Sequence, residues 1–343
     1  MTATDQIKLS LGNWLFHCQN GLGFYRLRNI DRKPLAVLMY HGLETDPERL
    51  AKSSHRVTPQ GCLQEIRFFQ RQGYRLIRAE EIDGLTDCRD PACSGYLLVT
   101  FDDGHANIFP YLKEWLECKK IPVLLGICPG IVEENRIYWW EEVRARFHLM
   151  RQACIEINDP AGAAQTFGKA EASQFEEIGR GCTDEELQWR LEQLRDQTRY
   201  LEPRELRNSP YVHENLNWQQ VIELARHPLC ALASHSFDHE IATQVPLDEF
   251  RLLTQASLEL LELRTGVRPR HYVYPNGVHS QETEKVLGEL GIRHSYSTRG
   301  VLNALPPAPL LNRLNGYDLG NRGLRHYGAL WRQRHSDYCR ANA

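Results

Sequence analysis

The segment Tyr96-Leu97-Leu98-Val99-Thr100-Phe101-Asp102-Asp103-Gly104 ends an apolar run with two adjacent carboxylates. A short continuous apolar run is typical of a strand that is buried on both faces, as in a parallel sheet. Neighbouring residues at the end of such a strand point in different directions, so the two carboxylates can have different roles. Gly104 allows the backbone to turn sharply after them. The alternative is a solvated acidic turn, because Asp and Gly are favoured in turns.

A second segment, His235-Ser236-Phe237-Asp238-His239, follows the apolar run Cys230–Ser234. If the segment makes a helical turn, its two imidazoles lie on one side. Neutral imidazole is a frequent ligand of zinc and similar ions. The alternative for this short pattern is one structural and one exposed histidine. Because both segments follow apolar runs, we expect their side chains to meet at the rim where the strands end.

Asp103, His235 and His239 together form a predicted metal site. Three protein ligands that leave positions open for water are typical of a catalytic site, whereas structural sites are closed. A bound divalent ion such as zinc lowers the pKa of water from 15.7 towards about 7. Asp102 then lies where a general base is needed, and the ion polarises a substrate carbonyl. The pattern therefore predicts a metal-dependent hydrolase.

Strand and helix signals alternate along most of the chain. Short apolar runs predict strands at residues 35–40, 96–101, 122–128, 230–234 and 271–274. Helical spacing and capping residues predict helices at residues 58–73, 108–119, 217–225, 247–265 and 280–290. This alternation predicts an α/β fold built on a parallel sheet or barrel.

Three stretches differ from this pattern. Residues 1–34 are predicted to be a helical lead-in to a main domain at 35–319, and residues 320–343 form an Arg-rich tail. Within the main domain, residues 138–213 carry no clear strand signal and are predicted to be a helical insertion. Trp139 and Trp140 open the insertion. They can offer a flat face to a sugar ring or dock the insertion, since Trp is highly buried on average.

Composition narrows the classes of function. A net charge of −3 over 343 residues gives no indication of nucleic-acid binding. No run approaches the ~18 apolar residues of a membrane span, although contact of the lead-in with a membrane surface stays open. The first residues lack the basic and apolar regions of a signal peptide. The ten cysteines form no CxxC pair and are interpreted as reduced thiols. We therefore expect a cytoplasmic protein, and the oligomeric state is not indicated.

The motifs resemble those of the polysaccharide deacetylase family, also called carbohydrate esterase family four or the NodB-homology domain. Three segments are similar to the family's motifs, the last in its YPxG form: Thr100–Gly104, Ser234–His239 and Tyr274-Pro275-Asn276-Gly277. Two more resemble the N-terminal part of the bacterial branch: Met39-Tyr40-His41 and Val57-Thr58-Pro59. The resemblance covers about 35–137 and 214–315.

The resemblance implies a deformed (β/α) barrel with fewer than eight strands. It also implies hydrolysis of N-acetyl groups from amino sugars, with zinc or a similar divalent ion. By the same resemblance Asp102 is the catalytic base, and Asp103, His235 and His239 are the metal ligands.

Further roles follow from the resemblance at the other motifs. Arg313 resembles the arginine that steadies the base carboxylate in this branch, since an adjacent cation holds a carboxylate ionised. A surface arginine is the alternative. In the YPxG-like segment, Tyr274 and Asn276 are the substrate or oxyanion candidates, and a backbone N–H near Asn276 is the expected partner of the metal.

Two departures from the family pattern leave the general acid open. His239 is followed by Glu240 where the family commonly has proline, and no Leu-x-His, in which many members carry their acid, occurs within the resembling stretch at 214–315; Leu324-Arg325-His326 lies beyond it in the Arg-rich tail. His41 is the candidate acid because it ends the first predicted strand and so faces the same rim. A hydrogen-bonded structural histidine is the alternative. His105 and His294 are weaker candidates.

The sequence thus predicts a metal-dependent hydrolase that deacetylates an N-acylated amino sugar in a glycan or glycoconjugate pathway. The motifs specify the metal and the water but not the acyl partner, so a hydrolase of a non-sugar amide or formamide is an alternative. A catalytically silent carbohydrate-binding homologue is a second alternative, supported only by the absence of a Leu-x-His from the resembling stretch at 214–315.

Overall fold

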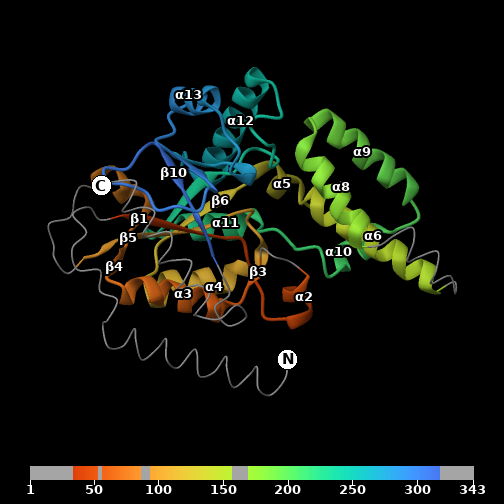
Figure 1. The fold of residues 1–343 in the computed structure, drawn as a ribbon, viewed down its shortest axis with the longest axis horizontal. Coiled ribbons are helices and arrows are strands. Elements are labelled where there is room, and N and C mark those ends of the chain that lie inside the picture. The colour runs from red at the N-terminus through yellow and green to blue at the C-terminus, as the bar shows by residue number, and fades with distance from the viewer. Residues whose placement is uncertain (1–33, 53–55, 86–92, 157–168, 317–343) are drawn as a thin grey trace, which may run out of the picture.

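A computed structural model describes residues 34–52, 56–85, 93–156 and 169–316 of the chain. The predicted tail at 320–343 and, apart from Pro34, the predicted lead-in lie outside the described residues. Within the described part, a parallel sheet is rolled into a barrel with helices around it, and a group of helices projects to one side (Figure 1).

Six parallel strands form most of the barrel. In chain order they are β1 (Leu35–Tyr40), β5 (Gly95–Phe101), β6 (Val123–Ile127), β7 (Cys230–Ser234), β8 (His271–Val273) and β9 (His294–Ser297). In space their order is β9-β8-β7-β6-β5-β1, and every pairing is parallel. The sequence pattern located β1, β5, β6, β7 and β8 and missed β9.

Residues 310–315 close the barrel. β10 (Leu310–Asn312) pairs with β9, while β11 (Leu314–Asn315) pairs with β1, so one stretch of chain joins both edges of the sheet. β4 (Tyr74–Leu76) pairs with the start of β5, on the edge that β6 occupies further along. β10 and β11 are short, and together they fill one strand position between β9 and β1. The expected deformed (β/α) barrel with fewer than eight full strands is therefore confirmed.

Burial on both faces explains why the strands are continuous apolar runs. Alternate residues of β1 and β5 point to opposite sides of the sheet. One set packs under the surrounding helices, and it includes Ala36, Leu38, Leu97, Val99 and Phe101. The other set, which includes Leu35, Val37, Tyr96 and Leu98, fills the barrel interior together with Tyr296 of β9.

The barrel helices begin and end near the residues that the sequence indicated. They are α3 (Pro59–Arg71), α4 (Phe109–Glu114), α11 (Trp218–Ala225), α12 (Leu247–Thr265) and α13 (Gln281–Glu289). Thr58 caps α3 by accepting a hydrogen bond from the Gly61 N–H, and Pro59 follows it. α2 (Pro47–Ala51) lies beside a separate two-stranded sheet of β2 (Gly42–Leu43) and β3 (Arg56–Val57).

A group of helices lies between β6 and β7 in the chain. It comprises α5 (Pro129–Glu134), α6 (Trp139–Glu156), α8 (Lys169–Gly181), α9 (Asp184–Gln197) and α10 (Pro203–Asn208). α6, α8 and α9 share a small apolar core and project from the barrel (Figure 1). Trp139 packs against this core. No strand occurs in the described residues between Trp139 and Asn208.

The described helices include none with the length and apolar content needed to span a bilayer. The cysteines whose side chains are described form no disulfide; they are Cys62, Cys93, Cys118, Cys128, Cys182 and Cys230.

Candidate active site

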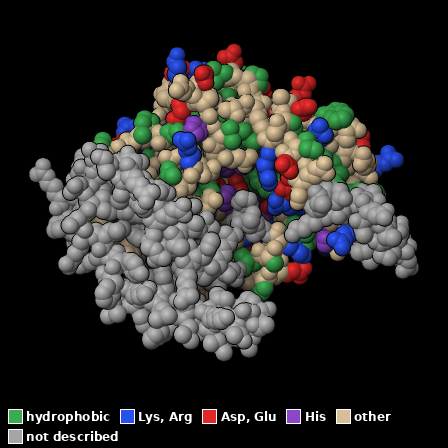
Figure 2. All heavy atoms as spheres, viewed as in Figure 1, with side chains coloured by type: hydrophobic (Ala, Val, Ile, Leu, Met, Phe, Trp, Pro, Cys, Tyr) green, Lys and Arg blue, Asp and Glu red, His purple; other side chains and the backbone are tan. Residues whose placement is uncertain are grey.

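The carboxyl ends of the barrel strands carry the polar residues that the sequence singled out. They line one cavity of about 590 Å³, and Figure 2 shows a hollow between barrel and projecting helices with histidine at its base. The predicted residues that line it are His41, Asp102, Asp103, His235, His239, Tyr274, Asn276 and Arg313. Parallel strands that end at one rim account for this convergence of distant segments.

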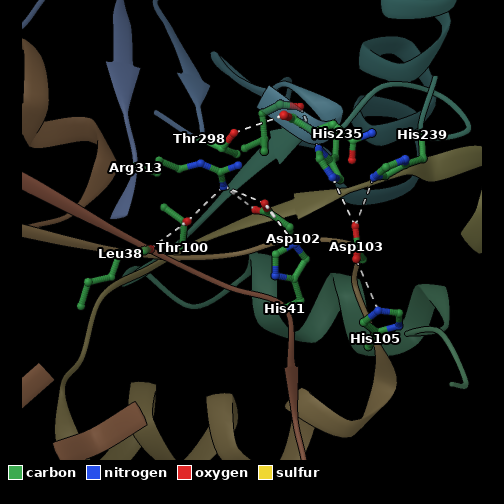
Figure 3. Close-up of polar contacts among 12 residues, drawn as sticks. Leu38, His41, Thr100, Asp102, Asp103, His105, His235, His239, Thr298 and Arg313 are labelled. Carbon is green, nitrogen blue, oxygen red and sulfur yellow. Dashed lines mark hydrogen bonds and ion pairs between the residues drawn. The ribbon is translucent and has the colours of Figure 1, made fainter. Parts of the chain in front are cut away.

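Asp103, His235 and His239 face one another (Figure 3). Asp103 Oδ1 lies 3.2 Å from His235 Nε2 and 3.6 Å from His239 Nε2. Ligand bonds of about 2 Å to one tetrahedral ion place their donor atoms about 3.3 Å apart. Within the described part of the chain, Asp103 Oδ1 is also a buried oxygen that accepts no hydrogen bond. The donor set and its spacing therefore fit one divalent ion.

A hydrogen bond on the side of the ring opposite Asp103 fixes the orientation of His235. Its Nδ1 lies 2.8 Å from the Val273 carbonyl oxygen of β8, to which it donates. This hydrogen bond leaves the Nε2 lone pair directed at Asp103, the arrangement expected of a metal ligand.

Unusual backbone conformations support the same residues. Asp103, Ser236 and His239 have φ values of 69°, 63° and 68°. Non-glycine residues rarely adopt this left-handed region, and such strain concentrates at functional sites. Gly104, with φ 68°, makes the sharp turn that the sequence indicated.

Gly130 allows the histidine segment to pack closely on α5. Its N–H donates to the Phe237 carbonyl oxygen at 2.9 Å. A β-carbon at position 130 would lie 2.6 Å from Cε1 of the Phe237 ring and would also overlap Asp238. The sequence analysis did not identify Gly130, because the contact joins segments that are far apart in the chain.

Asp102 is held beside this trio by Arg313. Arg313 Nη1 lies 2.7 Å from each Asp102 oxygen, while its Nε donates to the Ser297 carbonyl oxygen at 3.2 Å. On the other side, His41 Nε2 lies 3.9 Å from Asp102 Oδ2 (Figure 3). The structure thus places Asp102 outside the group of Asp103, His235 and His239 but next to it.

The charges of the site follow from burial and neighbours. Burial raises the pKa of Asp102, but the charge and hydrogen bond of Arg313, together with the charges of His235 and His41, outweigh burial, and the net pKa is lowered. Burial likewise opposes the contacts of Asp103 with His105 and His235, and its pKa still falls well below the usual range. Burial lowers the pKa of His239 to about 3. At neutral pH, in the ion-free state, two carboxylates are ionised and His239 is a neutral imidazole.

Of the remaining predicted residues, Tyr274 and Asn276 line the cavity and His294 lies outside it. Tyr274 lines the cavity, but its hydroxyl lies 3.2 Å from Thr283 Oγ1 on α13 and donates to it. Asn276 is exposed, with φ 54°, and its carbonyl oxygen accepts from Thr298 Oγ1 at 3.1 Å. His294 starts β9 and contacts Asp83 at 2.8 Å, so it lies at the other end of the barrel, away from the cavity.

A second buried polar cluster adjoins the trio. His105 Nε2 lies 3.4 Å from Asp103 Oδ2, and the His105 ring centroid lies 4.4 Å from that of His213. Glu141 of α6 contacts His213 Nδ1, and Arg56 Nη2 lies 2.9 Å from that nitrogen. Apart from His105, sequence reasoning missed these residues, since they come from separate segments without a shared motif.

Two aromatic residues at the start of the projecting helices also reach the site. The Trp140 ring centroid lies 4.5 Å from that of His239, and the Tyr138 hydroxyl donates to the Asp103 carbonyl oxygen at 2.5 Å. Trp140 and Trp139 both line the cavity. The projecting helices therefore form part of the wall around the site.

Comparison with known proteins agrees with this geometry. Residues 197–295 match the family model described as polysaccharide deacetylase. The resemblance to polysaccharide deacetylases is confirmed. The matched residues contain the His235–His239 segment, and the assignment to the YPxG branch stays a prediction. No curated protein matches the chain.

Solved structures of polysaccharide deacetylases and related enzymes share the fold. IcaB from Ammonifex degensii is 17% identical over 82% of this chain and 91% of its own, with a TM-score of 0.53. The Streptococcus pyogenes deacetylase PplD, solved with acetate, is 15% identical over 83% of this chain and 92% of its own, with a TM-score of 0.52. A de-N-acetylase from Aggregatibacter actinomycetemcomitans is 13% identical over 87% of this chain and 100% of its own, with a TM-score of 0.54.

Proposed function

We propose that this protein is a metal-dependent hydrolase that removes an N-acetyl group from an amino sugar. The observation that carries the proposal is the arrangement of the rim, where three possible metal ligands lie together and a fourth side chain, a carboxylate, lies beside them. Asp103, His235 and His239 face one another with the spacing of ligands, and Asp102 lies beside them, paired with Arg313. The polysaccharide deacetylase match supports a sugar amide as the substrate.

In this proposal, Asp103, His235 and His239 hold the ion, and the two imidazoles with one carboxylate suit zinc. When bound, a divalent ion supplies Lewis acidity for the amide carbonyl and lowers the pKa of water. Asp102 accepts the proton of the attacking water as general base. Arg313 keeps the Asp102 carboxylate ionised and aligned, since it contacts both of its oxygens.

The departing amine needs a proton, and His41 is the proposed donor. It lines the cavity, and its Nε2 lies 3.9 Å from Asp102. The proposed oxyanion position is the loop at Asn276, which also lines the cavity. The nearby Trp140 forms an apolar wall beside His239 that can exclude water from the acyl group.

A comparison of the two adjacent aspartates tests the function. Purified protein loaded with zinc or cobalt is assayed for acetate release from a panel of acetamido sugars, with formamide and ureido compounds included. We expect Asp102→Asn to lower kcat by about 10²–10⁴-fold while the metal content stays that of the wild type. We expect Asp103→Asn to lose the metal itself. Asp248→Asn, at an exposed position of α12, is the matched control.

Two outcomes contradict the proposal. If no acetamido sugar releases acetate and only formyl or ureido compounds react, the enzyme is a hydrolase of another amide. If no compound reacts and the wild type and Asp102→Asn behave alike, the protein is a silent homologue.

A further inference from the structure

The cavity extends beyond the barrel rim. α6 and α8 contribute a second wall that includes Arg144, Glu176 and Arg180, and the segment from α2 to β3 contributes a third with Lys52 and Arg56. Figure 2 shows Lys and Arg side chains along the edge of the hollow. A volume of about 590 Å³ lies within the ~300–1,000 Å³ of pockets that enclose whole ligands. The cavity therefore has room for more than the reacting acetamido group.

The wall formed by the projecting helices carries two guanidinium groups that share a single carboxylate. Glu176 is 4% exposed and accepts from Arg144 Nε and Nη2 at 2.6 and 2.7 Å. The same carboxylate accepts from Arg180 Nη2 at 2.9 Å. Two guanidinium groups thus share one carboxylate, and one positive charge is left over at the cavity.

Arg56 adds a further cation to the cavity. It is 5% exposed, and its guanidinium contacts two carbonyl oxygens and the His213 ring. Within the described part of the chain, no carboxylate lies within ion-pair distance of Arg56, and its Nε is buried without a partner. Burial lowers the pKa of Arg56 to about 10, and the charges of Glu141 and Glu44 oppose that shift. Arg56 stays protonated at neutral pH, and a buried charge that no carboxylate contacts directly is costly.

The other carboxylates of the cavity are already engaged. Asp102 is paired with Arg313, Asp103 belongs to the proposed metal site, and Glu141 contacts His213. Glu141 acts on Arg56 only across the His213 ring, and Arg144 and Arg180 share Glu176. An anionic group of a ligand would add a direct counter-charge to these cations.

We propose that the substrate is an amino sugar bearing a phosphate group, which Arg56 and the Arg144–Arg180 pair bind beyond the reacting amide. This inference rests on the proposed function and specifies its substrate class. A phosphate ester carries up to two negative charges and several acceptor oxygens, so cations on two walls can contact it together. The planar fork of arginine suits such an oxyanion. A carboxylate, with one charge and two oxygens, matches the two walls less well.

The test compares phosphorylated and neutral sugars in the wild type and in single variants. The probes are N-acetylglucosamine, its 1-phosphate, UDP-N-acetylglucosamine and a prenyl-diphosphate-linked N-acetylglucosamine; the last two distinguish a nucleotide from a lipid source. We expect kcat/KM for the 1-phosphate to exceed that for the neutral sugar by about tenfold or more. The preference should lie mainly in KM, because the phosphate is remote from the reacting bond.

The variants change the charge in both directions. Arg56→Gln and Arg180→Gln should each reduce the phosphate-to-neutral ratio of kcat/KM by about tenfold. Glu176→Gln removes the shared carboxylate and should keep or increase the ratio. Arg268→Gln is the matched control, since Arg268 pairs with Glu262 outside the cavity and should leave all rates unchanged. A ratio cancels general losses of folded protein.

The outcomes separate this inference from the proposed function. A wild-type ratio near one, or a ratio that neither Arg56→Gln nor Arg180→Gln lowers, overturns the phosphate subsite while deacetylation stands. The second of these results is expected if phosphate contacts only the metal. If no sugar is hydrolysed, calorimetry with the 1-phosphate and the neutral sugar decides. Tighter binding of the 1-phosphate that Arg180→Gln weakens supports the subsite without the proposed reaction, and equal binding overturns it.

Discussion

Arg313 and Asp102 form an ion pair inside the barrel rim, with Arg313 Nη1 2.7 Å from both carboxylate oxygens and each side chain 1% exposed. The two residues are 211 positions apart in the chain. They meet because Arg313 lies between β10 and β11, the short strands that close the barrel, while Asp102 follows β5, which only β1 separates from β11. The segment that closes the barrel therefore also positions the proposed base.

Arg313→Gln should lower both stability and activity. A buried carboxylate that loses its partner keeps an uncompensated charge, so we expect the free energy of unfolding to fall by about 3–5 kcal/mol. Urea denaturation measures this change. In the double variant with Asp102→Asn, the loss should be clearly smaller than the sum of the two single losses, because the residues act on each other. Additive losses would show that the pair is not coupled.

His105 should control how tightly the metal binds. Its Nε2 lies 3.4 Å from Asp103 Oδ2, on the oxygen that does not face His235 and His239. Partners of this kind orient a ligand, and their loss typically costs 10–100-fold in metal affinity. We expect a loss of about this size for His105→Phe, measured by competition with a chromogenic chelator.

His105→Gln is the matched control, because the glutamine amide keeps an N–H donor near Asp103. It should recover most of the affinity that the phenylalanine removes. Equal affinity of the phenylalanine variant and the wild type would show that Asp103 is held without His105, for example through the hydrogen bond from Tyr138 to its backbone.

Much of the site was predictable because its residues directly follow strands with strong sequence signals. β5 and β7 are mostly apolar and buried on both faces, so Asp102, Asp103 and the His235–His239 segment could be placed at one rim. Their roles, like the cytoplasmic location, remain predictions. The sharp turn at Gly104 was also predicted correctly.

Three strands and the second polar cluster could not be predicted from the sequence, and the reasons are physical. β9 has the polar sequence His-Ser-Tyr-Ser, yet all four residues are buried, because their side chains bond to neighbours such as Glu284 and Asn312. β10 and β11 are too short to leave a periodic pattern. Arg56, Glu141 and His213 come from three distant segments, and only tertiary packing brings them together.

Gly130→Ala should displace the His235–His239 segment while leaving every residue of that segment unchanged. The added β-carbon would come within 2.6 Å of the Phe237 ring, so the segment must shift away from α5. Because proposed metal ligands lie two residues on either side of Phe237, we expect metal affinity to fall by about 10-fold or more, as for other losses of ligand support. Chelator competition measures it, and Gly288→Ala, where the surroundings are open, is the control. Wild-type affinity in Gly130→Ala would contradict the close fit.

His271 should make the barrel sensitive to acid. It is 7% exposed at the start of β8, at the end of the barrel away from the cavity, and its Nδ1 lies within hydrogen-bond distance of the Tyr296 hydroxyl, at 3.0 Å. Burial, followed by the charge of His294, lowers the pKa of His271 to about 3. The folded state therefore keeps His271 neutral, whereas the unfolded chain protonates it below about pH 6.5.

Proton binding by His271 determines how stability changes with pH. Below about pH 6.5 the unfolded state binds more protons at His271 than the folded state does. The contribution of His271 to the free energy of unfolding is therefore complete above that pH and is lost as the pH falls towards 3. His271→Gln, which keeps an acceptor for Tyr296, should reduce the slope of unfolding free energy against pH by up to about 1.4 kcal/mol per pH unit. Urea denaturation from pH 8 to pH 4.5 measures both curves. They should run parallel near pH 8, where the residue is neutral in both states, and converge in acid. Parallel curves throughout would mean that His271 takes up its proton in the folded barrel as readily as in the unfolded chain.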